Sequence, residues 1–125
     1  GASIASTFFI TAATFGVMAA FGYFTKRDLS KMGSYLYMAL IGLIIATVVN
    51  LFLQSDTLMW IISYVGVLIF VGITAYDTQM IKSLVAESIG DEERTKKIAL
   101  LGALHLYLDF INLFLYLLRI LGRRN

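Results

Sequence analysis

The chain has 125 residues, of which 59% are hydrophobic and 14% charged, with a formal net charge of +2. Charged residues make up about a quarter of an average soluble domain, so this composition predicts a membrane protein. No cysteine and a single histidine are present, which excludes a disulfide framework and a closed structural zinc site. Any metal chemistry is therefore expected to use oxygen ligands. The basic residues lie in short clusters between apolar runs, so nucleic acid is not an expected partner.

Four charge-poor runs are each long enough to cross a bilayer, because about 20 apolar residues span a hydrocarbon core of about 30 Å. Lipid offers no partner for backbone amides, and no run alternates with the two-residue period of a barrel strand. The predicted fold class is an all-α membrane protein. We expect a single transmembrane domain over residues 1–125, with spans at about 3–25, 35–53, 58–81 and 98–119.

The first span enters an apolar run directly from Gly1, which favours a processed product or a part of a longer protein. The run is too long for a cleavable signal and has no basic stretch before it. Within it, Ala12, Gly16 and Ala20 recur every four residues. Small residues at this spacing let helices approach closely, so a helix contact is expected on this face.

The connections between the spans differ in charge, and this difference predicts the topology. The first connection, 26–34, holds three basic residues and the third, 82–97, holds four, whereas 54–57 holds none and the C-terminal tail three. By the positive-inside rule, 26–34 and 82–97 are expected on the cytoplasmic side. Gly90 predicts the end of the third helix, and Thr95 is the predicted cap of the fourth.

Asp109 lies near the middle of the fourth span, where an ionised carboxylate costs about 2.5–3.5 kcal/mol. At helical spacing it shares a polar stripe with other residues of that span: Gly102, His105, Asn112, Tyr116 and Arg119. The stripe is expected to face the interior of a bundle. One interpretation is a protonated Asp that joins helices by hydrogen bonding, and the favoured one is an ion or proton path.

Asp77 follows Tyr76 at the end of the third charge-free run, so it is either a solvated residue at the interface or a buried one. The apolar pattern continues to Lys82, whose long side chain can reach the surface, and this favours burial. If the third and fourth helices pack together, Asp77 and Asp109 can meet. Two carboxylates that share a site do not both ionise at low cost, so the pair is a candidate pH sensor.

Other polar residues near these two acids are candidate tuning residues. His105 lies one turn before Asp109, although a lone histidine in a bundle is more often a packing residue. Asn112 and Tyr76 are candidates of the same kind. No nucleophile elbow, phosphate-binding glycine loop or metalloprotease helix is present, so an enzyme is not expected and no cofactor is predicted.

Three segments resemble the bacterial branch of the Bax inhibitor-1 family: TKRD at 25–28, the Tyr76-Asp77-Thr78 core of residues 74–78, and LYLDFINLF at 106–114. The resemblance covers the whole chain and implies the last four spans of a seven-helix protein in a bacterial inner membrane, with the missing upstream helices as partners. It also implies a calcium-permeable leak, controlled by pH through Asp77 and Asp109, in which deprotonation frees an early helix to move.

The leading functional hypothesis is therefore a pH-sensitive calcium leak, with calcium and protons as its ions and Asp77 and Asp109 as transient oxygen ligands for calcium. Two alternatives stay open. One is a membrane interaction protein that modulates a membrane protease or a stress-response complex. The other is a proton-coupled cation exchanger, whose transport would scale with the proton gradient.

Overall fold

The computed structural model describes residues 3–122, which form four α-helices. The helices are α1 (Ile4–Phe24), α2 (Ser30–Leu53), α3 (Asp56–Glu87) and α4 (Glu92–Gly122). Over the described range there is no strand, and all four helices are long and apolar enough to cross a membrane. The predicted all-α membrane fold is confirmed.

Serine residues cap the N-termini of α1 and α3. The hydroxyl oxygen of Ser3 accepts a hydrogen bond from the amide of Ser6, and that of Ser55 accepts one from the amide of Leu58. These bonds satisfy amides that have no partner within the first turn of a helix. Gln54, between α2 and α3, has a left-handed backbone with φ of 52°, which reverses the chain within a short turn.

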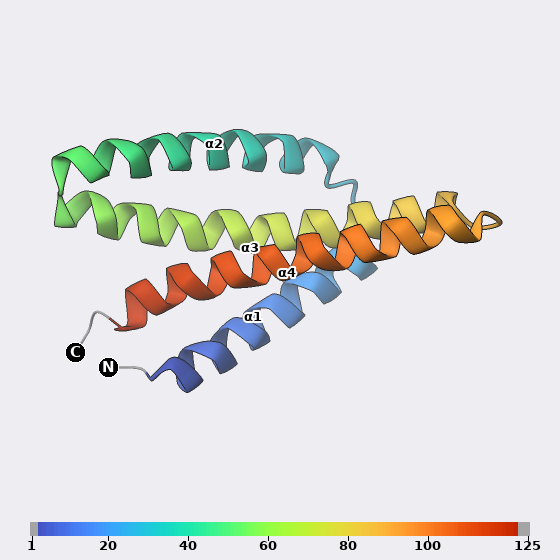
Figure 1. Ribbon diagram of the computed structural model, residues 1–125, viewed down its shortest axis with the longest axis horizontal. Helices are drawn as coiled ribbons and strands as arrows, with labels where there is room; N and C mark the ends of the chain where they lie inside the picture. Colours follow the sequence, from blue (N-terminus) through green and yellow to red (C-terminus); the bar gives the residue numbers. More distant parts are fainter. Residues whose placement is uncertain (1–2, 123–125) are drawn as a thin grey trace.

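The four helices run up and down, so that both ends of the described chain lie at one end of the bundle together with the α2–α3 turn (Figure 1). The α1–α2 connection and the α3–α4 turn lie toward the opposite end. Helix α3 is central: it packs against α1, α2 and α4, whereas the backbone of α2 lies close only to that of α3 among the described residues. The side chains of α3 therefore decide what the bundle encloses.

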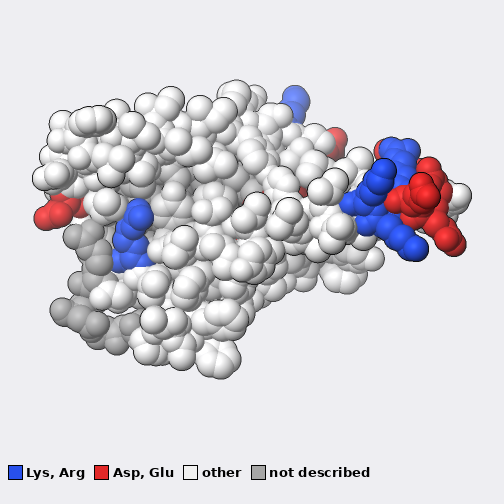
Figure 2. Space-filling model, in the orientation of Figure 1, with Lys and Arg blue, Asp and Glu red and all other residues white. Residues whose placement is uncertain are grey.

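Charged side chains gather at the two ends of the molecule, and a broad uncharged belt lies between them (Figure 2). Many large apolar side chains are exposed, among them Phe9, Phe52 and Leu68. Exposed apolar area on this scale is unfavourable in water and is solvated by lipid tails in a bilayer. The belt is the expected surface of a membrane-embedded bundle.

The helices extend beyond the charge-free runs, and this changes the third connection. Residues 82–97 were predicted to link two spans, but α3 continues to Glu87 and α4 begins at Glu92. The prediction of Thr95 as a cap is wrong: Thr95 lies inside α4, and the carboxylate of Asp91 accepts the hydrogen bond from the amide of Arg94 instead. Gly90, with φ of +103°, lies in the turn after α3 as expected.

Helix α2 also begins earlier than the span that the sequence predicts. Ser30 begins the helix, five residues before the predicted start of the span. Charged residues such as Lys31 are good helix formers, so a helix can continue outside a bilayer where a charge-free run ends. The limits of the membrane-spanning segments stay predictions.

The close contact of α1 lies elsewhere than predicted. Gly16 is exposed, and no atom of the described part of the chain lies within 4 Å of the position a Cβ would take there. Gly22, which is buried, lies directly against the backbone of Ala75 on α3, where a Cβ would overlap the carbonyl group. The small residue that lets α1 approach α3 is therefore Gly22.

Candidate functional site

Asp77 is fully buried on the face of α3 that turns toward the other helices. Residues three, seven and eleven positions before it on this face, Thr74, Phe70 and Gly66, are also buried. The hydroxyl of Tyr37 on α2 donates a hydrogen bond of 2.8 Å to Oδ1 of Asp77. The alternative in which Asp77 is a solvated residue at the membrane surface does not hold in this structure.

Asp109 is 4% exposed and lies on the face of α4 that contacts α3. Small residues allow the two helices to approach. Gly102 on α4 lies against the side chain of Ile81, and Gly66 on α3 lies against the ring of Tyr116. The part of the polar stripe that holds Gly102 and Asp109 thus faces α3, and it brings Asp109 to Asp77.

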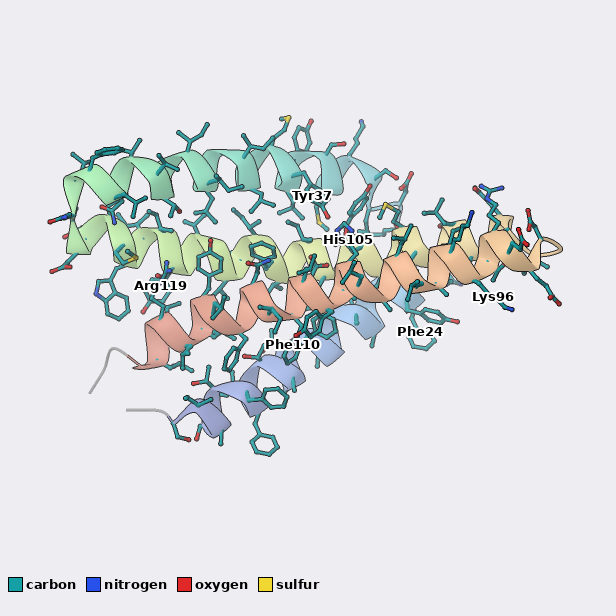
Figure 3. All side chains as sticks on the ribbon, in the orientation of Figure 1. Phe24, Tyr37, Lys96, His105, Phe110 and Arg119 are labelled. Carbon is teal, nitrogen blue, oxygen red and sulfur yellow. The ribbon has the colours of Figure 1, made fainter. Side chains whose placement is uncertain are left out.

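His105 completes a cluster with the two acids, which we call the Asp-His-Asp cluster. One oxygen of Asp77, one oxygen of Asp109 and one ring nitrogen of His105 all lie within 4.8 Å of one another. Nε2 of His105 is 3.0 Å from Oδ2 of Asp77 and 2.9 Å from the hydroxyl of Tyr37. Figure 3 shows Tyr37 and His105 close together beside α3, from α2 and α4.

The proton on His105 follows from the bond made by Tyr37. A tyrosine hydroxyl has one hydrogen to donate, and in Tyr37 it goes to Asp77. The Tyr37 oxygen can then only accept from Nε2 of His105, so this nitrogen carries a hydrogen. One chain of hydrogen bonds therefore joins three helices: it runs from His105 on α4 to Tyr37 on α2 and on to Asp77 on α3.

Two oxygens of the cluster are left without a hydrogen bond. Oδ2 of Asp77 and Oδ2 of Asp109 are buried and have no hydrogen-bond partner among residues 3–122. The contact of Asp77 with Nε2 of His105 is close enough for an ion pair with a protonated imidazole, but it does not form a hydrogen bond. A buried oxygen without a partner is costly, so the cluster is well suited to take up a proton or a cation.

The two other candidate tuning residues are placed differently. The ring of Tyr76 contacts that of Tyr37 edge to face, with 6.0 Å between the centroids. The amide of Asn112 donates to the carbonyl of Leu108 in its own helix at 2.9 Å. Over residues 3–122, neither side chain forms a hydrogen bond to the carboxylates, and Tyr76 contacts Tyr37, which does.

Tyr37 was not identified from the sequence, although it donates the only hydrogen bond to the carboxylate of Asp77 within the described range. Its signal was weak: a tyrosine in a charge-free run is common, and its spacing does not reveal the helix that it faces. A tyrosine hydroxyl that is buried within a span needs a hydrogen-bond partner, which is the one hint that the sequence contains.

Comparison with known proteins agrees with this architecture. The family model described as inhibitor of apoptosis-promoting Bax1 matches residues 1–125. The inner membrane protein YbhL of Escherichia coli K12 is 58% identical over 126 residues, which cover 99% of this chain and 53% of YbhL. A protein of Rickettsia prowazekii, RP147, is 53% identical over 125 residues, covering 100% of this chain and 52% of its own length. A third relative, from Borreliella burgdorferi, is 54% identical over 123 residues, covering 98% and 53%.

The chain thus spans about half the length of the curated relatives it matches. The name of the E. coli relative and the four long apolar helices confirm the predicted location in an inner membrane, while the orientation of the connections stays a prediction. With a family model that matches from the first residue to the last, the chain belongs to the Bax inhibitor-1 family of membrane proteins.

Proposed function

We propose that this chain is part of a calcium-permeable leak of the inner membrane, opened and closed by protonation of the Asp77–Asp109 pair. The observation that carries the proposal is the position of the pair. Two buried carboxylates from neighbouring helices lie within 4.8 Å of each other, and each has an oxygen without a partner. Intramembrane acids in such positions often serve ion or proton paths.

Charge repulsion supplies the force for gating. Two unit charges 4.8 Å apart repel by about 3.5 kcal/mol at an effective dielectric constant of about 20. A proton shared by the pair removes this repulsion and lets α3 and α4 stay packed. Loss of the proton restores it, and a free energy of this size is enough to shift a two-state equilibrium by more than a hundredfold.

Other titratable side chains near the pair influence where it gains and loses its proton. Tyr37 on α2 and His105 on α4 contact Asp77, and Tyr76 on α3 contacts Tyr37. Helix α1 carries no charged residue, and its one titratable side chain, Tyr23, lies against Lys82. The imidazole of His105 is thus the one cation-forming group in contact with the pair among the described residues.

Calcium is proposed as the ion because carboxylate oxygens suit a hard cation and because the family resemblance implies it. The cytoplasmic side is proposed for residues 26–34 and 82–97, where basic residues are concentrated. No enzymatic activity is proposed. The basic residues Arg123 and Arg124, which entered the count of charges, lie outside the described residues.

The proposal is tested by calcium flux into proteoliposomes that contain the complete gene product, measured from acidic to mildly alkaline pH. Flux is expected to rise with pH, and Asp77→Asn and Asp109→Asn are each expected to remove that dependence. Glu93→Gln is the matched control, because Glu93 is an exposed acid on α4 far from the pair in sequence. This variant is expected to keep the pH profile of the unmodified protein.

Other results would favour the alternatives. A flux that scales with an imposed proton gradient, and not with the calcium gradient alone, would favour a proton-coupled cation exchanger. Absence of flux at every pH would reject the leak and favour a membrane interaction protein. Such a protein would keep its cellular effect in the two Asn variants and lose it when a helix face is altered.

A further inference from the structure

We propose that the Asp-His-Asp cluster is a binding site for a divalent transition-metal ion of the zinc class. The cluster combines two carboxylates and one imidazole, Asp77, Asp109 and His105, with their ligand atoms within 4.8 Å of one another. The sequence predicted oxygen ligands alone, because nothing in it placed His105 beside Asp77. The structure adds the nitrogen ligand, and this changes the kind of ion that the site prefers.

The distances fit a small tetrahedral ion. Zinc binds imidazole nitrogen and carboxylate oxygen at about 2.0–2.2 Å, so neighbouring ligand atoms of a tetrahedral site lie about 3.4 Å apart. Nε2 of His105 and Oδ2 of Asp77 are already 3.0 Å apart, and Asp109 needs a side-chain shift of about 1.4 Å at most to close the set. Three protein ligands leave the fourth position for water.

The environment of the two carboxyls is a second observation that points to a ligand: their Oδ2 atoms meet no hydrogen-bond donor among residues 3–122, so they need either a proton shared between them or a bound cation. Oδ2 of Asp77, on a side chain that is fully buried, and Oδ2 of Asp109, on one that is 4% exposed, have no hydrogen-bond partner in the described chain. Buried carboxylate oxygens are normally satisfied by hydrogen bonds or by a cation. A divalent ion would satisfy both oxygens at once and balance the charges of the two carboxylates.

The donor set favours zinc over calcium as the ion held at equilibrium. Calcium takes six to eight oxygen ligands and does not use imidazole as a preferred ligand. The cluster has four carboxylate oxygens, and one of them, Oδ1 of Asp77, already accepts a hydrogen bond from Tyr37. Imidazole suits zinc, copper, nickel and iron, and zinc also accepts carboxylate oxygen as a ligand.

Tyr37 acts as a positioning residue for this site. Metal binding at Nε2 of His105 requires the ring proton to lie on Nδ1, so the contact with the Tyr37 hydroxyl is released. The hydroxyl keeps its bond to Oδ1 of Asp77 and orients that carboxylate. Partners of this kind, one step from the ion, typically change metal affinity 10- to 100-fold.

His105, whose side chain is 44% exposed, is the member of the cluster that reaches the surface of the described bundle. Next to it lies a cavity of about 150 Å³ between α3 and α4, lined in part by Met80, Ile81, Leu101 and Gly102. The inference does not depend on calcium transport, because it concerns binding at equilibrium. If the proposed leak is correct, a bound ion would hold α3 and α4 together and keep the path closed.

The test is zinc binding to the purified complete gene product in detergent at neutral pH, followed by calorimetry. Cobalt is used as a spectroscopic probe, because tetrahedral Co²⁺ has intense visible absorption bands. We expect one zinc ion per chain, retained when calcium is present in large excess, because a set that includes imidazole favours zinc over calcium. His105→Asn and Asp109→Asn are expected to weaken zinc binding at least 100-fold, and Tyr37→Phe about 10- to 100-fold.

The control variant carries Glu92→Gln and Glu93→Gln, which neutralise exposed acids at the start of α4 and leave the cluster intact. It is expected to bind zinc as the unmodified protein does. Thermal unfolding of each variant shows that it is folded. Absence of zinc binding, unchanged binding in folded His105→Asn, or loss of binding in the control variant would each overturn the proposal. Since no flux is measured, a failure of the leak hypothesis leaves this result unaffected.

Discussion

Replacing Gly22 with alanine should separate α1 from α3. Gly22 lies directly against the carbonyl of Ala75, and a Cβ at this position would overlap a backbone atom that has no free rotation. Ala75 is fully buried, so it cannot move away without displacing α3 from its neighbours. The clash can be relieved only by a shift of one helix by about 1 Å, which packed interiors resist.

The expected cost is that of overpacking, about 1–3 kcal/mol in the free energy of unfolding. Alanine also has a higher helix propensity than glycine, by about 1 kcal/mol, and this gain partly masks the clash. Gly16→Ala isolates the propensity term, because Gly16 is on the same helix and has open space around it. The difference between the two variants should therefore equal the clash alone.

Unfolding of the purified protein in mixed micelles by increasing SDS gives both values. Gly16→Ala should unfold at a higher SDS fraction than the unmodified protein, and Gly22→Ala should be less stable than Gly16→Ala by about 1–3 kcal/mol. A shift of α1 would also disturb the bond from Lys82 to the carbonyl of Tyr23, the residue next to Gly22. If Gly22→Ala and Gly16→Ala stabilise equally, the close approach of α1 to α3 is refuted.

Three smaller predictions concern other contacts. Tyr37→Phe leaves Oδ1 of Asp77 without its donor and should destabilise the fold by about 1–3 kcal/mol in the same SDS assay; no change would show that the bond is not formed. The hydroxyl of Ser30, and to a smaller extent its amide, donate hydrogen bonds to Asp28 and hold the pKa of its carboxyl below the usual range. The stability that these two bonds add is present above the usual pKa of an aspartate and is lost as pH falls through the lowered pKa. A carboxyl ¹³C titration should show this, and Ser30→Ala should raise the pKa of Asp28 part of the way back. Gly90→Ala should cost about 1–2 kcal/mol by SDS unfolding, because φ of +103° disfavours a Cβ; an unchanged stability would contradict that geometry.

The helices were predictable because a bilayer imposes a strong and local requirement. Each span needs about 20 apolar residues, and such runs are visible without knowledge of any contact. The ends of the helices were less predictable, because lysine, glutamate and arginine are good helix formers outside the membrane. Helix α3 therefore continues past Lys82 to Glu87, where the change in charge had suggested a loop.

The two acids were found for different reasons. Asp109 interrupts an apolar run in mid-span, so its cost in lipid marks it directly. Asp77 stands at the end of a run, and only the packing of α3 at the centre of the bundle decides that it is buried. The spacing of His105 suggested contact with Asp109 in its own helix, whereas its closest acidic contact is with Asp77.

Contacts between helices were the least predictable part of the site. Tyr37 is 40 residues from Asp77 and 68 from His105 in sequence, and no periodicity links them. The small-residue pattern around Gly16 identified a motif but not its partner, and the contact is made at Gly22. A pattern within one helix shows which residues share a face, but not which helix covers that face.

The most direct test of the central claim is to compare calcium flux against pH for Asp77→Asn, Asp109→Asn and the variant that carries both substitutions. If the two carboxylates hold one proton between them and act as a unit, each single substitution should already abolish the pH dependence. The double variant should then add nothing, since sites that act together are strongly non-additive. If each single variant instead keeps part of the pH dependence and the double variant shows the sum of the two losses, the carboxylates act separately and the account of a shared-proton gate is wrong.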